Sequence, residues 1–240
     1  MKESRKTDPL KRAYSSNRTA RLGSQEAHAL RILSEAIQAA RRMRALLILV
    51  ALLYVGSYLL GWYLISVRSP FALEMSQALG EAVMTQQPFT AILESLKGGQ
   101  LINAILITVL VNLSIGAFLT TTLPGVVPLL GALGTAAITF LRGLVVGITY
   151  PEVLSLSPAA FALGIGTLIL ELGAYVFSGA AGINIALAPI MPRRYGVESR
   201  RAAFKMAWKD AARIYVIVVL LLVLGAVWEM GGIFLVMRPG

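Results

Sequence analysis

Three ionisable residues, Arg142, Glu171 and Glu229, stand inside long apolar stretches of the sequence. A charge at the centre of a bilayer costs about 2.5–3.5 kcal/mol on insertion scales, so such residues face the protein interior and find partners there. We therefore predict a buried polar cluster in which Arg142 pairs with Glu171, Glu229 or both. Its chemistry would be a proton or ion relay, or a headgroup-binding cavity. The alternative, which we favour, is a polar clamp that fixes helix register, although one arginine neutralises at most one of the two carboxylates.

The rest of the sequence offers few groups for catalysis or for binding a metal. It has no cysteine and a single histidine, His28, which excludes a thiolate nucleophile and a histidine cluster for a metal. It contains neither a phosphate-binding glycine loop nor a His-Glu-x-x-His motif. The apolar stretches also hold no lysine that would activate a serine. We therefore predict that the chain is not an enzyme and that it has no metal and no cofactor.

Composition indicates that the apolar stretches lie in a membrane. The chain is 57% hydrophobic and 14% charged, whereas soluble domains have about 45–50% apolar and about 25% charged residues. We predict an all-α fold, a polytopic membrane helix bundle with about five transmembrane helices, each long enough to cross a hydrocarbon core of roughly 30 Å. The predicted spans are about 45–65, 101–122, 126–150, 159–188 and 213–236. Pro124 and Pro128 leave open a re-entrant hairpin in place of a full third span.

The distribution of lysine and arginine predicts the orientation, because these residues keep short loops in the cytoplasm. Eleven of them precede the first span and seven lie in 190–213, against two in 66–100. Five spans with a cytoplasmic N-terminus place both rich segments inside. Counted from the span ends, Arg142, Glu229 and Glu171 then lie roughly 12, 10 and 18 Å below the outer boundary, so that all three share the outer half of the membrane.

Two basic segments precede the first span. Residues 1–23 are polar without a periodic apolar face, which predicts a disordered basic cytoplasmic tail. Residues 24–44 predict a basic amphipathic helix with Leu30, Leu33 and Ile37 on one face, either lying on the inner leaflet or extending the first span into the cytoplasm. The net charge of +10 is explained by this orientation, so we predict no nucleic-acid partner and a multi-pass protein of the cell membrane.

The connection between the first two spans predicts two short amphipathic helices along the outer membrane surface. Pro88 separates them, and Gly98 and Gly99 end the second.

Small residues at helical spacing indicate close helix packing. Gly143 and Gly147 form a G-x-x-x-G pattern, and Gly179 and Gly182 bound a run of small residues. Such residues let helices approach closely in lipid, so these positions predict tight packing and no chemistry. Three asparagines are expected to bond between helices rather than to bind a ligand: Asn103, Asn112 and Asn184.

Three short motifs occur in order over the second half of the chain. They are Arg142-Gly143 with Gly147, then Glu171-Leu-Gly-Ala174 with Ser178-Gly179 and Gly182, then Gly225 to Glu229. In these motifs the segment from about Asn103 to Leu235 resembles the stage II sporulation protein M family of integral membrane proteins. The chain departs from the family pattern where Thr167 replaces a histidine and Arg142 replaces an asparagine.

The resemblance implies a multi-span protein of poorly defined biochemistry. The namesake in spore formers anchors and organises peptidoglycan hydrolases. The family also occurs in prokaryotes that never sporulate, so a sporulation role is not carried over to this chain.

Two functions remain open from the sequence. The first is a non-enzymatic integral membrane scaffold or assembly subunit, in keeping with the lack of catalytic groups. The alternative is a transporter or permease-like subunit that uses the buried Arg–Glu cluster, with a separate ATPase docked on the basic helices at 24–44 and 196–212. The expected partners are the lipid bilayer and other membrane or cytoplasmic proteins, and an oligomer of this chain stays open.

Overall fold

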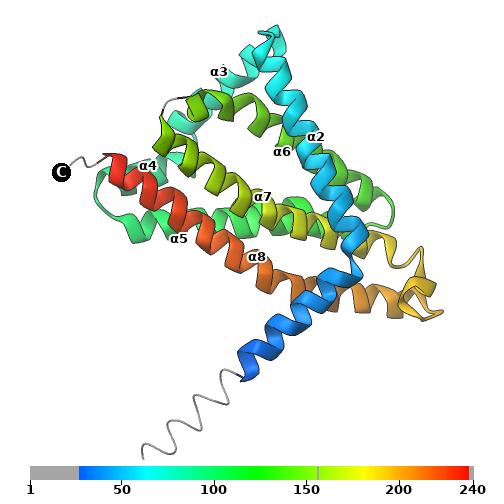
Figure 1. Cartoon of the computed structure of the whole chain (residues 1–240). Coiled ribbons are helices and arrows are strands. Elements are labelled where there is room, and N and C mark those ends of the chain that lie inside the picture. The colour runs from blue at the N-terminus through cyan, green and yellow to red at the C-terminus, as the bar shows by residue number, and fades with distance from the viewer. Residues whose placement is uncertain (1–26, 156, 238–240) are drawn as a thin grey trace, which may run out of the picture.

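The computed structural model describes residues 27–155 and 157–237, and in these residues it forms an all-α bundle without strands (Figure 1). Five of its helical segments are long and apolar enough to cross a membrane. They are Arg44–Ser66, Leu101–Val126, Leu130–Thr149, Pro158–Leu187 and Arg200–Met237. The predicted fold class and number of spans are confirmed. The tail predicted for residues 1–23 lies outside the described residues.

A separate helix precedes the first span. It runs over residues 27–42, is interrupted by a turn at Met43, and is followed by α2 (Arg44–Ser66). Figure 1 shows this N-terminal helix projecting away from the bundle at an angle to α2. The helix that the sequence predicts for residues 24–44 therefore ends at residue 42 and does not simply extend the first span.

Two short helices connect the first and second spans, as the sequence predicts. They are α3 (Pro70–Thr85) and α4 (Phe89–Lys97). Pro70 is the first residue of α3, where its fixed φ suits a helix start and its missing N–H is not needed. Gly99 follows α4 with a φ of 76°, a left-handed conformation that glycine adopts without steric cost. This turn brings the chain back into the membrane at the start of the second span.

The second span changes helix type along its length. It begins as α5 (Leu101–Val111), continues as a π-helix, η1 (Asn112–Thr122), and ends as a 3₁₀-helix, η2 (Leu123–Val126). A π-helical stretch is rare and is often found at functional sites. The second span is thus longer than the predicted 101–122, because η2 belongs to it.

The third span is α6 (Leu130–Ser155), which follows a turn at Pro128. Its predicted start at residue 126 is therefore four residues early. The segment is one continuous helix, so the structure has a full-length helix in place of the re-entrant hairpin that the two prolines left open.

The fourth span, α7 (Pro158–Leu187), lies at the centre of the bundle and contacts α2, α6, α8 and η1. The Ser157 hydroxyl caps it by accepting a hydrogen bond from the Ala160 N–H at 3.1 Å. Its second half is buried almost completely, from Ser178 to Ala186, because small side chains there allow neighbouring helices to come close.

The last helix, α8, runs over Arg200–Met237 and has 38 residues. At 1.5 Å per residue it is roughly 57 Å long, well beyond a hydrocarbon core of roughly 30 Å. The span predicted for 213–236 is therefore the apolar part of a longer helix. The short helix η3 (Pro192–Tyr195) lies between α7 and α8 and contacts α8.

Candidate functional site

Arg142 on α6 binds the backbone of the π-helix rather than a carboxylate. Its Nη1 and Nη2 both donate to the Gly116 carbonyl oxygen at 3.2 Å, and Nη2 also donates to the Thr120 hydroxyl at 3.0 Å. The guanidinium carbon lies 4.1 Å from the centre of the Tyr175 ring on α7, a cation–π contact. One arginine therefore joins α6, η1 and α7.

Gly116 is the residue that makes this arrangement fit. A Cβ at this position would lie 2.7 Å from the Tyr175 hydroxyl oxygen, which is too close for a real side chain. The Gly116 carbonyl also accepts hydrogen bonds from the hydroxyls of Thr120 and Thr121. Hydroxyls and the arginine thus saturate a carbonyl that lies inside the membrane-spanning region, where an unpaired carbonyl would be costly.

Glu171 on α7 is held by an amide. The Asn112 Nδ2 at the start of η1 donates to Glu171 Oε1 at 2.7 Å. The Glu171 side chain also lies over Gly225 of α8, where a Cβ would come within 3.3 Å of its Cγ. Asn112 thus bonds between helices, as the sequence predicts for its asparagines. Asn103 of α5 also bonds between helices, because it donates to the Ser95 hydroxyl of α4 at 2.8 Å. Asn184 differs from the prediction, since its buried Nδ2 has no hydrogen-bond partner of ordinary geometry in the described residues.

Glu171 and Glu229 share a cavity of about 370 Å³. Asn112 lines it with them, and apolar residues of α4, among them Phe89 and Leu96, form another wall. This volume falls within the roughly 300–1,000 Å³ of small-molecule pockets. The cavity therefore holds two carboxylates at the end of the bundle that α3 and α4 cover.

The structure brings together two of the three charges that the sequence singled out. Arg142 forms no ion pair with Glu171 or Glu229, and neither glutamate is ion-paired to another residue of the described chain. The predicted pairing of the arginine with a glutamate is therefore absent. The physical reason is that the Gly116 carbonyl and the Thr120 hydroxyl of η1, together with the Tyr175 ring of α7, already satisfy the guanidinium.

A family model described as Stage II sporulation protein M matches residues 45–230, which is most of the chain. The chain belongs to the stage II sporulation protein M family. No curated protein and no solved structure matches it. The match covers all five spans, apart from the first and last residues of the bundle, and leaves out the N-terminal helix at 27–42.

The glycines of the stage II sporulation protein M motifs lie at close helix contacts. A Cβ at Gly143 would collide with the Ser57 hydroxyl of α2, and one at Gly147 would collide with the Tyr58 carbonyl. Gly182 of α7 lies against the Thr121 carbonyl in the same way, and Gly179 packs near Val50. The first two positions set the approach of α6 to α2, and the other two set the approach of η1 and α2 to α7.

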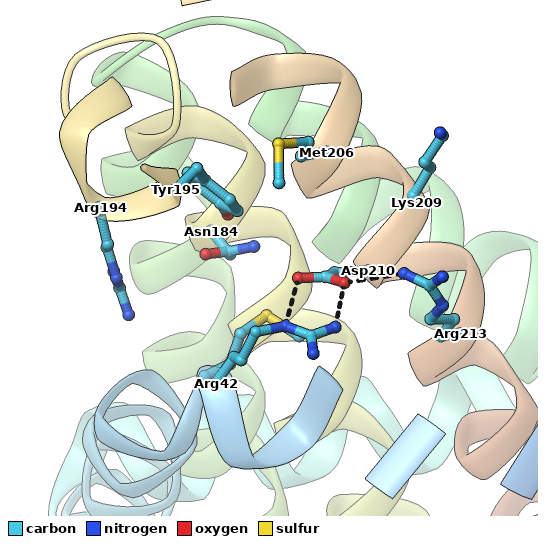
Figure 2. A pocket seen from close by; sticks show the side chains of 9 residues that line it. Arg42, Asn184, Arg194, Tyr195, Met206, Lys209, Asp210 and Arg213 are labelled. Atoms are coloured by element: carbon cyan, nitrogen blue, oxygen red, sulfur yellow. Dashed lines mark hydrogen bonds and ion pairs between the residues drawn. The ribbon is translucent and has the colours of Figure 1, made fainter. Parts of the chain in front are cut away.

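A second charged centre, which sequence reasoning missed, lies at the opposite end of the bundle from the glutamates, since Asp210 and Glu229 stand 19 residues, roughly 28 Å, apart on α8. Figure 2 shows this centre from close by. Asp210 of α8 is buried and accepts hydrogen bonds from Arg42 through both carboxylate oxygens, with Arg42 Nε at 3.1 Å from Oδ2. Arg213 Nη1 donates to the same carboxylate at 3.3 Å, and its Nε donates to Glu35 at 3.2 Å. The four residues attach the N-terminal helix to α8.

Electrostatics agree with a firm attachment. The hydrogen bonds that Arg42 donates to Asp210 raise the pKa of Arg42, and the negative charge of Asp210 raises it further, against the opposing effect of burial. Hydrogen bonds from Arg31 and then Arg213 lower the pKa of Glu35. The signal in the sequence was an aspartate at the polar start of an apolar stretch, three residues before an arginine. Its partner Arg42 lies 168 residues away, so no local pattern could supply it.

The same centre borders a cavity of about 470 Å³. Its lining includes Arg42, Asp210 and Arg213, together with Arg194 and Lys209. Figure 2 shows Asn184 of α7 and Tyr195 of η3 completing the wall. Asn184 is 3% exposed. Burial raises the pKa of Tyr195, against an opposing contact with the Asn184 amide.

Proposed function

We propose that this chain is a non-enzymatic assembly subunit of the cell membrane, which holds a partner protein through its projecting N-terminal helix. The observation that carries the proposal is an apolar stripe on that helix that the rest of the described chain leaves uncovered. Leu30 and Ile37 are 67% and 42% exposed, and Leu33 lies between them. Ala36 and Ala39, on the other side of the helix, are buried.

The attachment of the helix supports this role. The ion pairs from Arg42 and Glu35 to α8 fix the helix along one side, so that the stripe keeps a constant direction. A scaffold needs such a fixed face, because ordering a free helix on binding would cost conformational entropy.

The chemistry of the stripe defines its partner. Arg41 lies beside Ile37 in the shallow groove along this face. A partner helix with apolar residues flanked by acidic ones fits this face by shape and charge. The N-terminal helix that carries this face lies outside the segment that matches the family model. A helix with an exposed apolar face, attached to the transmembrane bundle, supports an assembly role.

In-cell photo-cross-linking tests the proposal. A photoreactive amino acid at Ile37 is expected to give a discrete protein adduct, whereas the same group at His28 is not. The two positions differ by nine residues, which at about 100° per residue places them on opposite sides of the helix. An Ile37 adduct with lipid alone would mean that the stripe lies on the membrane, and the proposal would fall.

A matched pair of double substitutions distinguishes specific binding at the stripe from nonspecific hydrophobic association. Leu30→Ser with Ile37→Ser is expected to abolish the adduct formed from Leu33. Leu49→Ser with Leu52→Ser, which removes two exposed leucines from α2, is expected to leave it. Equal loss in both pairs would contradict a specific face.

The cavity of Glu171 and Glu229 favours a second candidate, a permease-like subunit that passes a proton or a small cation. Two carboxylates without a cation partner in the described residues are suited to taking up positive charge. The test uses proteoliposomes with a trapped pH dye and an imposed potential. Glu171→Gln is expected to abolish proton flux, while Glu94→Gln on the exposed side of α4 is expected to retain it. Absence of flux in the unsubstituted protein would remove this candidate.

A further inference from the structure

The cavity beside Asp210 has the features of a site for a phosphate group. Four of its lining residues are cationic and one is anionic: Arg42, Arg194, Lys209 and Arg213 against Asp210. Its volume of about 470 Å³ lies within the roughly 300–1,000 Å³ typical of ligand pockets. The excess of positive charge favours an anion.

Several donors in this cavity are left for a ligand. Nε and Nη2 of Arg42 both donate to Asp210. Nη1 of Arg213 also donates to Asp210, and Nε of Arg213 donates to Glu35. Neither Arg42 Nη1 nor Arg213 Nη2 forms a hydrogen bond within the described chain. Asp210 thus holds both guanidinium groups in place while each keeps a donor, a geometry suited to phosphate oxygens.

The buried amide of Asn184 is an independent observation. Its Nδ2 is buried and makes no hydrogen bond of ordinary geometry in the described residues, although the amide faces the Tyr195 hydroxyl. Buried polar groups are almost always hydrogen-bonded, so a free donor of this kind calls for a partner. Figure 2 shows the amide next to Tyr195 and close to Asp210 and Arg42.

The position of the cavity identifies the carrier of the phosphate. From Asp210 to the end of α8 at Met237 the helix is roughly 40 Å long, about the thickness of a bilayer including its headgroups. Asn184 lies three residues before the end of α7, and Arg42 two residues before the start of α2. The cavity therefore lies at the level of the lipid headgroups. Met43 and Met206 add apolar lining for the carbon chain next to a headgroup.

We propose that this cavity binds the phosphate of an anionic phospholipid headgroup, held by Arg42, Arg194, Lys209 and Arg213 and oriented by the Asn184 amide. Basic pockets between transmembrane helices on the cytoplasmic side are the usual sites for such headgroups. The predicted orientation, with both basic segments inside, places this pocket at the inner leaflet. The proposal can fail separately from the assembly role, because Arg194, Lys209 and Asn184, whose substitution tests it, lie outside the N-terminal helix.

Titration of the purified full-length protein, followed by native mass spectrometry, tests the proposal. Dioctanoyl phosphatidylglycerol is expected to bind, and dioctanoyl phosphatidylcholine to bind at least roughly tenfold more weakly, because it lacks a net negative charge. Inorganic phosphate is the third probe. Binding of inorganic phosphate as tight as that of phosphatidylglycerol would overturn the assignment to a lipid.

Paired substitutions locate the site. Arg194→Gln with Lys209→Gln is expected to weaken phosphatidylglycerol binding roughly tenfold or more. The matched control is Arg201→Gln with Lys205→Gln, which removes the same charge from residues outside the cavity lining and is expected to change binding little. Equal weakening in both pairs would show general attraction to a basic surface and would overturn the proposal.

A charge-neutral variant tests the amide. Asn184→Leu keeps the net charge and similar bulk, and it is expected to weaken phosphatidylglycerol binding roughly tenfold or more, the loss of one hydrogen bond to a charged group. Binding unchanged in a folded Asn184→Leu variant would remove the amide from the site. The paired substitutions at the rim are exposed, so they keep the test valid if this buried variant fails to fold.

Discussion

Asp210, at one end of the bundle, accepts hydrogen bonds from two arginines, whereas Glu171, at the other end, accepts one from the neutral amide of Asn112. Glu229 shares the cavity of Glu171 and has no ion-pair partner in the described residues. A carboxylate held by two cations is fixed and serves attachment. A carboxylate without a cation can exchange a proton or hold a cation. The end with Asp210 is therefore suited to structural attachment, and the end with Glu171 and Glu229 to binding a proton or a cation.

The largest expected effect comes from breaking the paired end. Asp210→Ala removes the hydrogen bonds to Arg42 and Arg213 and is expected to lower the free energy of unfolding by about 1–3 kcal/mol, discounted because both arginines stay partly hydrated. Unfolding in mixed detergent micelles measures the change. Spin labels on the N-terminal helix and on α8 should also move apart.

Glu198→Ala is the control for that variant, because Glu198 is exposed and forms no ion pair in the described chain. An Asp210→Ala protein as stable as this control, with unchanged label distances, would contradict the attachment.

Arg142 lies between the two ends. Its substitution tests whether a buried arginine contributes to stability without a carboxylate partner. Arg142→Met is expected to cost about 1–2 kcal/mol, since the Gly116 carbonyl keeps its threonine donors but loses the charged ones. Arg142→Lys should recover only part of this stability, because lysine lacks the planar fork. If Glu171→Gln together with Arg142→Met restored full stability, an Arg–Glu pairing would be indicated after all.

The unpaired end is expected to tolerate neutralisation. Glu171→Gln keeps an oxygen that accepts from Asn112, so the free energy of unfolding should change by less than about 0.5 kcal/mol. Glu171→Ala loses the bond and should cost about 1 kcal/mol. If Glu171→Gln destabilised the protein as much as Asp210→Ala does, the contrast between an ion-paired end and an unpaired end would be wrong.

The smallest effect is a pH dependence of the paired end. The pKa of Glu35 in the folded state is lower than its ordinary 4.5, so its ion pairs contribute at pH above that value and are lost as the pH falls through the folded pKa. The N-terminal helix should loosen in that acid range, as spin-label distances would report. Glu35→Gln should be looser at neutral pH and less sensitive to acid, and an identical acid response would exclude Glu35 as its source.

Sequence reasoning predicted the bundle well and the partners of its charges poorly. The five spans could be predicted because a helix in hydrocarbon needs a long run of apolar residues, and such runs are visible in the sequence. Two boundaries differed from the prediction for different reasons. The second span continues through η2, where the helix type changes, and α8 begins well before residue 213 because its helix continues past the apolar part of the segment. The π-helix at Asn112–Thr122 gave no signal, since its residues would fit an α-helix equally well.

Among the site residues, the sequence identified Arg142, Glu171 and Glu229 as charges that need protein partners. It could not assign those partners, because Arg142 is satisfied by the Gly116 carbonyl and a carbonyl carries no residue-type signature. Asp210 was not identified for a related reason: an aspartate among basic residues at a helix start is ordinary in sequence.

The sequence by itself determined that the protein lies in a membrane, that it is all-α, how many spans it has and to which family it belongs. Each of these depends on composition or on motifs within a short stretch of chain. The tertiary structure alone decided which charges meet. Arg42 and Asp210 are separated by 168 residues, and Asn112 and Glu171 by 59. Contacts of that kind follow from how α7 packs at the centre of the bundle, which is set by the fit of many side chains at once.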